Sequence, residues 1–225
     1  MKAFAISDPH GCARTLKTLV EVLALESGDH LFLLGDYVNK GPNAKGVLDL
    51  VMQWQHAPFA LTALKGNHDQ LLLDASRNRE MVPDLQGAQG SSTLESFGVA
   101  DPADIPAPYL HWIAQLPTVA AWKEYLFVHA GFRFDMKDPL TPQQSHLHIR
   151  GWYDQINYQW LGNRIIIHGH DQTTAPGITR QLRSLDQNRV LDIDAGCVNT
   201  EEAGKGYLCA FDLIHQTCIF QPNID

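Results

Sequence analysis

Apolar runs of strand length alternate with segments of helical periodicity in the first third of the chain. The predicted elements are, in chain order, a strand at 2–7, a helix near 13–25, a strand at 31–35, a helix near 44–55, a strand at 59–64 and a helix from about 69. In the first helix, Leu16, Leu19 and Leu23 fall on one face, as expected for a helix that packs on a core. This order of strands and helices predicts a parallel sheet with right-handed crossovers.

The pattern changes in the second half, where strands come with fewer helices between them. Predicted strands lie near 125–129, 164–168, 190–194, 207–213 and 217–221. A short turn joins the last two, which we expect to pair as a hairpin. Together the two halves predict an α/β (α+β) fold of two packed mixed β-sheets flanked by helices.

Residues 79–108 interrupt this pattern, because they are polar and rich in glycine and proline. A short helix is expected at 91–97, and an aromatic and aliphatic stripe predicts another near 108–116. We interpret the segment at about 79–116 as a surface excursion of one domain that spans residues 1–225.

Five of the apolar runs end in side chains that commonly bind metal ions. All of these side chains carry oxygen or nitrogen donors; they are Asp8, His10, Asp36, Asn67, His68, His129, His168 and His170. In open α/β sheets, ligands bind in the crevice at the carboxyl ends of the strands. The pattern therefore predicts one site for two hard or borderline metal ions.

The composition limits the possible partners. The chain has 225 residues and a net charge of −8, which disfavours nucleic acid because nucleic-acid binding needs a basic face. A phosphate substrate stays possible, since two divalent cations would reverse the local charge. No apolar run approaches the ~20 residues of a membrane span, and the first residues do not resemble a secretory signal. We therefore expect a cytoplasmic protein with no membrane partner, and the oligomeric state stays open.

The absence of other motifs excludes several mechanisms. None of the four cysteines starts a Cys-x5-Arg motif, so a cysteine-nucleophile phosphatase is excluded. The chain has no GxxxxGK[ST] motif and no GxGxxG after a strand, so nothing in it indicates an NTPase or a Rossmann domain. It also has no HExxH motif.

The metal-binding motifs, taken as a set, resemble the calcineurin-like metallophosphoesterases. In chain order they are Asp8-x-His10, Gly35-Asp36 with Gly41, Gly66-Asn67-His68-Asp69, His129 and Gly169-His170. The similarity is greatest to the bacterial serine/threonine phosphoprotein phosphatases, through GSSTLESFGV (90–99), the neighbourhood of Arg150 and DIDAGC (192–197). This resemblance implies an αββα sandwich.

The resemblance also implies roles for the site residues. Two divalent metal ions would be held, one by Asp8, His10 and Asp36 and the other by Asp36, Asn67, His129 and His170. Manganese is the first expectation, with iron or zinc as alternatives. Asp36 would bridge the ions, a hydroxide between them would attack phosphorus directly, and His68 would protonate the leaving oxygen.

The chain departs from the phosphatase pattern at Asn39 and Lys40, where the family carries Asp-Arg. An aspartate there would pair with His68, whereas Asn39 has no charge, so we predict a lower pKa for His68. Lys40 offers a point charge in place of a planar guanidinium, which leaves Arg150 as a candidate phosphate clamp.

Three further residues have supporting roles in this interpretation. Asn67 is expected to contact the substrate phosphate in addition to its metal. His168 and Asp194 are candidates for contacting and orienting the metal ligands without binding the metal themselves.

Three functions fit these motifs. The first is hydrolysis of phosphomonoesters, with phosphoserine or phosphothreonine in a protein, or a small phosphoester, as substrate. The alternative is a symmetrical dinucleoside polyphosphate hydrolase acting on diadenosine tetraphosphate, a sister branch that also lacks the aspartate; Trp152, Tyr153 and Trp160 could then stack on adenine. The third is an inactive metal-dependent binding protein, which only Asn39 and Lys40 support.

Overall fold

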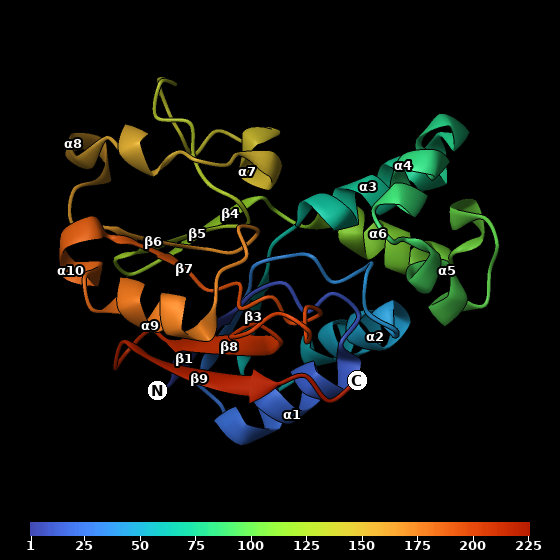
Figure 1. The fold of residues 1–225 in the computed structure, drawn as a ribbon, viewed down its shortest axis with the longest axis horizontal. Helices are drawn as coiled ribbons and strands as arrows, with labels where there is room; N and C mark the ends of the chain where they lie inside the picture. Colours follow the sequence, from blue (N-terminus) through green and yellow to red (C-terminus); the bar gives the residue numbers. More distant parts are fainter.

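The computed structural model describes residues 1–225 as two β-sheets with helices on their outer sides (Figure 1). The strands are β1 (Ala3–Ile6), β2 (His30–Leu33), β3 (Ala60–Ala63), β4 (Val119–Trp122), β5 (Tyr125–Val128), β6 (Ile165–His168), β7 (Val190–Asp192), β8 (Tyr207–Asp212) and β9 (Thr217–Pro222). The α-helices are α1 (Ala13–Leu23), α2 (Ala44–Trp54), α3 (Asn67–Arg77), α4 (Val82–Gly87), α5 (Ser91–Phe97), α6 (Ala107–Gln115), α7 (Ser145–His148), α8 (Tyr158–Leu161), α9 (Ala175–Leu182) and α10 (Leu185–Asn188). Three 3-10 turns are η1 (Arg79–Met81), η2 (Pro102–Asp104) and η3 (Tyr153–Gln155).

Both sheets are mixed, as predicted. One holds five strands in the order β3-β2-β1-β8-β9, and the other holds four in the order β4-β5-β6-β7. Strands β1 to β3 run parallel, as do β5 to β7, and antiparallel β8, β9 and β4 complete the sheets. The predicted hairpin is confirmed in β8–β9, where Asp212 pairs with Thr217 across the turn.

Alternate residues of each strand enter different hydrophobic layers. In β1, Ala3 faces the second sheet, whereas Phe4 belongs to the cluster formed with α1 and α2. Phe32 of β2 stacks on Phe127 of β5 with 4.2 Å between ring centroids, so these rings join the two sheets. Burial on both faces fixes the register of each strand, since a slip by one residue would exchange its faces.

The hydrophobic pattern misses β4 and α9, as well as the shorter helices α4, α7, α8 and α10. Strand β4 enters β5 through a two-residue turn between Trp122 and Tyr125, where Lys123 adopts a φ of 51° without the glycine or asparagine that usually marks such turns. Helix α9 begins after Thr174, whose side chain accepts from the Gly177 backbone N–H. The proline and glycine in its first turn obscure the helical periodicity, although a capping threonine with a proline two residues later is itself a helix-start signal.

The segment 79–116 folds as short helices that pack on α2 and α3. The helices predicted at 91–97 and near 108–116 are α5 and α6. Figure 1 shows α3 to α6 gathered at one end of the molecule, at the upper right, away from α8 and α10. No helix in the structure has the length and apolar character that a membrane crossing requires.

Candidate metal centre

The predicted ligands lie just beyond the carboxyl ends of five strands. They follow β1, β2, β3, β5 and β6, with the first three of these strands in one sheet and the last two in the other. Six non-glycine residues of this region adopt a positive φ, which such residues rarely do; they are Asp8, His10, Asp36, Asn39, Lys40 and His170. Backbone strain of this kind concentrates at functional sites.

Asp36 belongs to two groups of buried ligand atoms. The first group joins it to His10 and His68, and the second joins it to Asp8 and His129, with the atoms of each group within 4.8 Å of one another. His10 Nε2 lies 3.5 Å from Asp36 Oδ2, and His129 Nε2 lies 3.6 Å from Asp36 Oδ1. A carboxylate that faces one imidazole with each oxygen is placed to bridge two ions.

Backbone carbonyls turn the ligand nitrogens of His10 and His129 toward Asp36. His10 Nδ1 donates to the Val38 carbonyl at 3.0 Å, and His129 Nδ1 donates to the Leu34 carbonyl at 2.8 Å. Carbonyl oxygens only accept, so each Nδ1 carries the proton and each Nε2 presents a lone pair. Metal-binding histidines are usually held in this way.

Several buried polar atoms of the cluster lack a suitable protein partner. Asn67 Oδ1 faces His129 Nε2 at 2.9 Å although both atoms are acceptors, and His170 Nδ1 donates to the same oxygen at 3.0 Å. Asp8 Oδ1 and His170 Nε2 are buried without any hydrogen-bond partner. Buried acceptors of this kind are costly unless a cation or donor meets them. The donor set therefore fits divalent metal ions.

Burial shifts the protonation of the acids and the bases in opposite directions. Loss of hydration, followed by the nearby Asp194 carboxylate, raises the pKa of Asp8 well above its usual range. Burial lowers the pKa of His10, and it lowers the pKa of His170 to about 2. The imidazoles are thus neutral and ready to bind a metal, and bound cations would favour the ionised carboxylates.

Asp69 holds the loop that carries Asp36. Its carboxylate accepts three backbone N–H groups, from Asp36 at 2.9 Å, Tyr37 at 2.9 Å and Gly66 at 2.8 Å. Position 66 requires glycine, because a Cβ there would collide with the Asp36 carboxylate. The His68 backbone N–H donates to Asp36 Oδ1 at 2.9 Å, so the GNHD segment orients this central carboxylate.

Removing the Asp69 carboxylate is expected to destabilise the fold. Asp69→Ala leaves three buried N–H groups without an acceptor, which costs about 3 kcal/mol or more in the free energy of unfolding. Urea denaturation followed by circular dichroism measures this loss. Asp74→Ala is the matched control, because Asp74 lies on the same helix and its side chain bonds only Gln70. A loss no larger than the control's would contradict the role given to Asp69.

Asn39 connects the cluster to α5. Its backbone N–H donates to Thr93 Oγ1 at 2.8 Å, and the Thr93 hydroxyl donates to Asn39 Oδ1 at 2.9 Å. Because its oxygen is engaged, Asn39 presents its amide nitrogen to His68 Nδ1, 3.0 Å away. His68 Nδ1 therefore accepts, and Nε2 carries the proton of the neutral ring. Burial and the charge of Lys40 lower the pKa of His68 to about 3, which is the predicted direction.

The two cations predicted to bind phosphate lie beside predicted metal ligands. Lys40 Nζ lies 2.9 Å from His10 Nε2, so its ammonium meets a ligand lone pair. Arg150 is exposed and pairs with Asp171, and its Nη1 lies 3.4 Å from the His170 carbonyl oxygen. Their role in binding phosphate stays a prediction.

The two residues predicted to support the ligands have different surroundings. His168 is fully buried, with Nδ1 2.8 Å from the Gly169 carbonyl and Nε2 2.9 Å from the Tyr153 hydroxyl. Its ring nitrogens are therefore engaged in holding the turn after β6. The Asp194 carboxylate accepts from the Gly196 backbone N–H at 2.9 Å, and no hydrogen bond joins it to a ligand histidine.

Sequence reasoning assigned no role to Asp69 or Thr93, which organise the cluster. The position of Asp69 in the first turn of α3, three residues after Gly66, is a helix-start signal that the sequence offers. Thr93 offers no comparable signal, because it lies 54 residues beyond Asn39 and meets it only in the folded chain.

Comparisons with known proteins agree with this geometry. The sequence profile described as calcineurin-like phosphoesterase matches residues 1–197. Two relatives, each named bis(5'-nucleosyl)-tetraphosphatase, symmetrical, come from Ectopseudomonas mendocina (strain ymp), at 33% identity over 134 residues, and Dechloromonas aromatica (strain RCB), at 36% over 132 residues. Each match covers 58% of this chain but only 45% and 44% of the respective relative, so the chain matches less than half the length of either. A solved structure of a provisionally assigned diadenosine tetraphosphatase superposes with a TM-score of 0.67 at 21% identity, over 100% of this chain and 94% of that one, which shows a shared fold.

The fold and its buried ligand cluster place the chain among the metallophosphoesterases. The chain belongs to the calcineurin-like phosphoesterase family. The two relatives described here carry the name of the sister branch that the motifs gave as the alternative.

Proposed function

We propose that this chain hydrolyses symmetrical dinucleoside tetraphosphates, such as diadenosine tetraphosphate, at the central phosphoanhydride bond to give two nucleoside diphosphates. The two relatives named above suggest this substrate class. The sequence match spans less than half of each relative. The assignment of this substrate class to the chain therefore rests on the hydrogen bonding within the site.

The proposed cofactor is a pair of divalent cations, with manganese as the first candidate and iron or zinc as alternatives. One would be held by Asp8, His10 and Asp36, and the other by Asp36, Asn67, His129 and His170. The Asp8 carboxylate lies between the two positions, because it is grouped with Asp36 and His129 and also lies 3.9 Å from His10 Nε2. When bound, the ions would supply an activated water and offset the charge of the phosphates.

The hydrogen bond from Asn39 to His68 is the observation that carries the proposal. It makes Nδ1 an acceptor, so the neutral His68 ring holds its proton on Nε2. Such a ring can donate a hydrogen bond from Nε2, but loss of that proton would leave an imidazolate. The partner at Nδ1 is uncharged and burial disfavours the imidazolium that an efficient proton donor requires, even though the Asp36 carboxylate lies 4.0 Å from Nε2.

A weak proton donor suits a phosphoanhydride better than a phosphoserine. The alkoxide released from phosphoserine or phosphothreonine is strongly basic and needs protonation as it leaves. A nucleoside diphosphate leaves as a phosphate group whose last pKa is about 6, so it departs as an anion near neutral pH. A hydrogen bond from His68 Nε2 is sufficient to stabilise that departing charge.

The cations around the cluster also suit a long anionic substrate. Lys40 and Arg150 are the proposed contacts for phosphates beyond the one attacked, together with the amide of Asn67. Of the rings considered for stacking on adenine, Trp152 is fully buried and Trp160 is half-buried, whereas Tyr153 is 40% exposed and is the most accessible to a base.

The test compares three substrates with manganese-loaded protein: diadenosine tetraphosphate, p-nitrophenyl phosphate and a phosphothreonine peptide. We expect kcat/KM for diadenosine tetraphosphate to exceed that for the peptide by about 10²-fold or more, the usual worth of a general acid that only the peptide needs. p-Nitrophenyl phosphate should be turned over, because its leaving group also departs as an anion. Equal or faster hydrolysis of the peptide would refute the proposal and return the phosphomonoesterase hypothesis to first place.

A further inference from the structure

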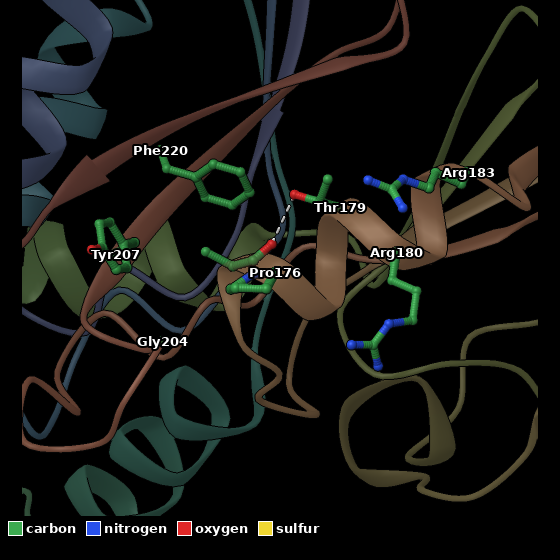
Figure 2. A pocket seen from close by; sticks show the side chains of 8 residues that line it. Pro176, Thr179, Arg180, Arg183, Gly204, Tyr207 and Phe220 are labelled. Carbon is green, nitrogen blue, oxygen red and sulfur yellow. Dashed lines mark hydrogen bonds between the residues drawn. The ribbon is translucent and has the colours of Figure 1, made fainter.

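A hollow of about 650 Å³ lies between α9 and the β8–β9 hairpin (Figure 2). Its lining includes Pro176, Thr179, Arg180, Arg183, Tyr207 and Phe220. None of these residues belongs to the proposed metal ligands or phosphate contacts. The volume is within the ~300–1,000 Å³ typical of small-molecule sites.

The hairpin supplies an aromatic end to this hollow. The rings of Tyr207 on β8 and Phe220 on β9 meet edge to face, with 6.4 Å between centroids and 80° between planes. Both side chains are half-buried, so part of each ring is accessible from the hollow. Figure 2 shows the two rings on one side and Pro176 beside them. Rings held in this way offer a packing surface for a planar heterocycle.

Helix α9 supplies a cationic end. Arg180 and Arg183 are exposed one turn apart on α9 and lie on the side of the hollow away from the rings (Figure 2). Arg79, Arg133 and Arg150 each pair with an aspartate, whereas Arg180 and Arg183 form no ion pair, as is also true of Arg14, Arg77, Arg164 and Arg189. Like charges at this spacing repel each other, and the chain as a whole is acidic. An anion in the hollow would therefore meet two guanidinium groups that no carboxylate already engages.

We propose that this hollow binds a nucleoside phosphate, with the base against Tyr207 and Phe220 and the phosphates against Arg180 and Arg183. A ligand that fits both ends needs a flat ring and at least one strong anion on a short linker. Guanidinium groups suit phosphate oxygens because their donors match them in pairs. This inference does not depend on which phosphate bond the metal centre cleaves.

The test measures nucleotide binding to the manganese-loaded full chain by equilibrium dialysis. The probe is α,β-methylene adenosine diphosphate, which resists hydrolysis. In the double variant Arg180→Ala/Arg183→Ala, we expect nucleotide binding at the hollow to be about tenfold weaker or more. Hydrolysis at the metal centre should be unchanged. Lys17→Ala/Lys123→Ala removes two exposed cations elsewhere and is the matched control for net charge.

Two further measurements separate this site from the metal centre and test its aromatic end. Asp36→Asn is expected to retain the nucleotide binding at the hollow that the double arginine variant weakens. Tyr207→Leu should weaken binding of the nucleotide but leave binding of methylene diphosphonate, which has no ring, unchanged. Undiminished nucleotide binding in the double arginine variant would overturn the proposal, as would tighter binding of a phosphotyrosine peptide than of the nucleotide.

Discussion

Asp36→Asn is expected to lower kcat/KM for every phosphate substrate by about 10³-fold, because loss of a bridging ligand removes several kcal/mol of transition-state stabilisation. Asp36 is the one residue common to both groups of buried ligand atoms. Its two oxygens face His10 and His129 separately, so one substitution weakens both proposed ion positions. Asparagine keeps the shape of the side chain and tolerates the φ of 58° at this position, which separates the loss of charge from a change of fold.

The measurement pairs steady-state hydrolysis with titration calorimetry of manganese into metal-stripped protein. Asp135→Asn is the matched control, because Asp135 is exposed and pairs only with Arg133. The variant should show weaker metal binding together with the loss of turnover, while the control should match the wild type. Activity within about tenfold of wild type at saturating manganese would exclude Asp36 as the bridging ligand.

The clustering of the predicted metal ligands could be foreseen from the sequence because it depends on strand ends. Each of β1, β2 and β3 is a short apolar run, and parallel strands that share a sheet deliver their following residues to one edge. Asp8, Asp36 and Asn67 are thus brought together by topology alone. His129 and His170 come from the other sheet, and their placement required that the two sheets pack face to face, as the paired hydrophobic layers imply.

The orientation of Asn39 was not predictable from the sequence. The side chain at this position could accept from His68 or donate to it, and the choice depends on what engages the amide oxygen. That partner is Thr93, which reaches the site on α5 from within the segment interpreted as a surface excursion. Helix α9 was missed because the proline and glycine of its first turn obscure the helical periodicity, and strand β4 because no glycine or asparagine marks its turn at Lys123.

Under the proposed function, the Asn39–His68 pair links the choice of substrate to one hydrogen bond. In the phosphatase pattern, an acidic residue at this position would accept the proton of His68 Nδ1 and stabilise the imidazolium. In this chain the amide reverses the direction of the bond. The same metal ligands could therefore serve two kinds of leaving group, with residue 39 deciding whether the histidine delivers a proton or only a hydrogen bond.

Asn39→Asp is accordingly expected to raise hydrolysis of a phosphothreonine peptide by about tenfold or more, part of the worth of a restored general acid. The new carboxylate would raise the pKa of His68 by favouring its charged form. Because a general acid has to be protonated, the gained activity should be present below the raised pKa and should fall as pH rises through it. Diadenosine tetraphosphate, which needs no proton on its leaving group, should change less than about threefold.

The sharpest measurement of this change is the dependence of kcat/KM on the leaving-group pKa in a series of aryl and alkyl phosphates. The wild type should show a steep decline toward basic leaving groups, and the decline should become shallower in Asn39→Asp because the histidine then neutralises the departing oxygen. Asn188→Asp adds the same charge on α10, at an exposed position, and should leave the slope unchanged. Identical slopes for wild type and Asn39→Asp would show that residue 39 does not set the proton-donating power of His68, and the preference for a phosphoanhydride would then need another origin.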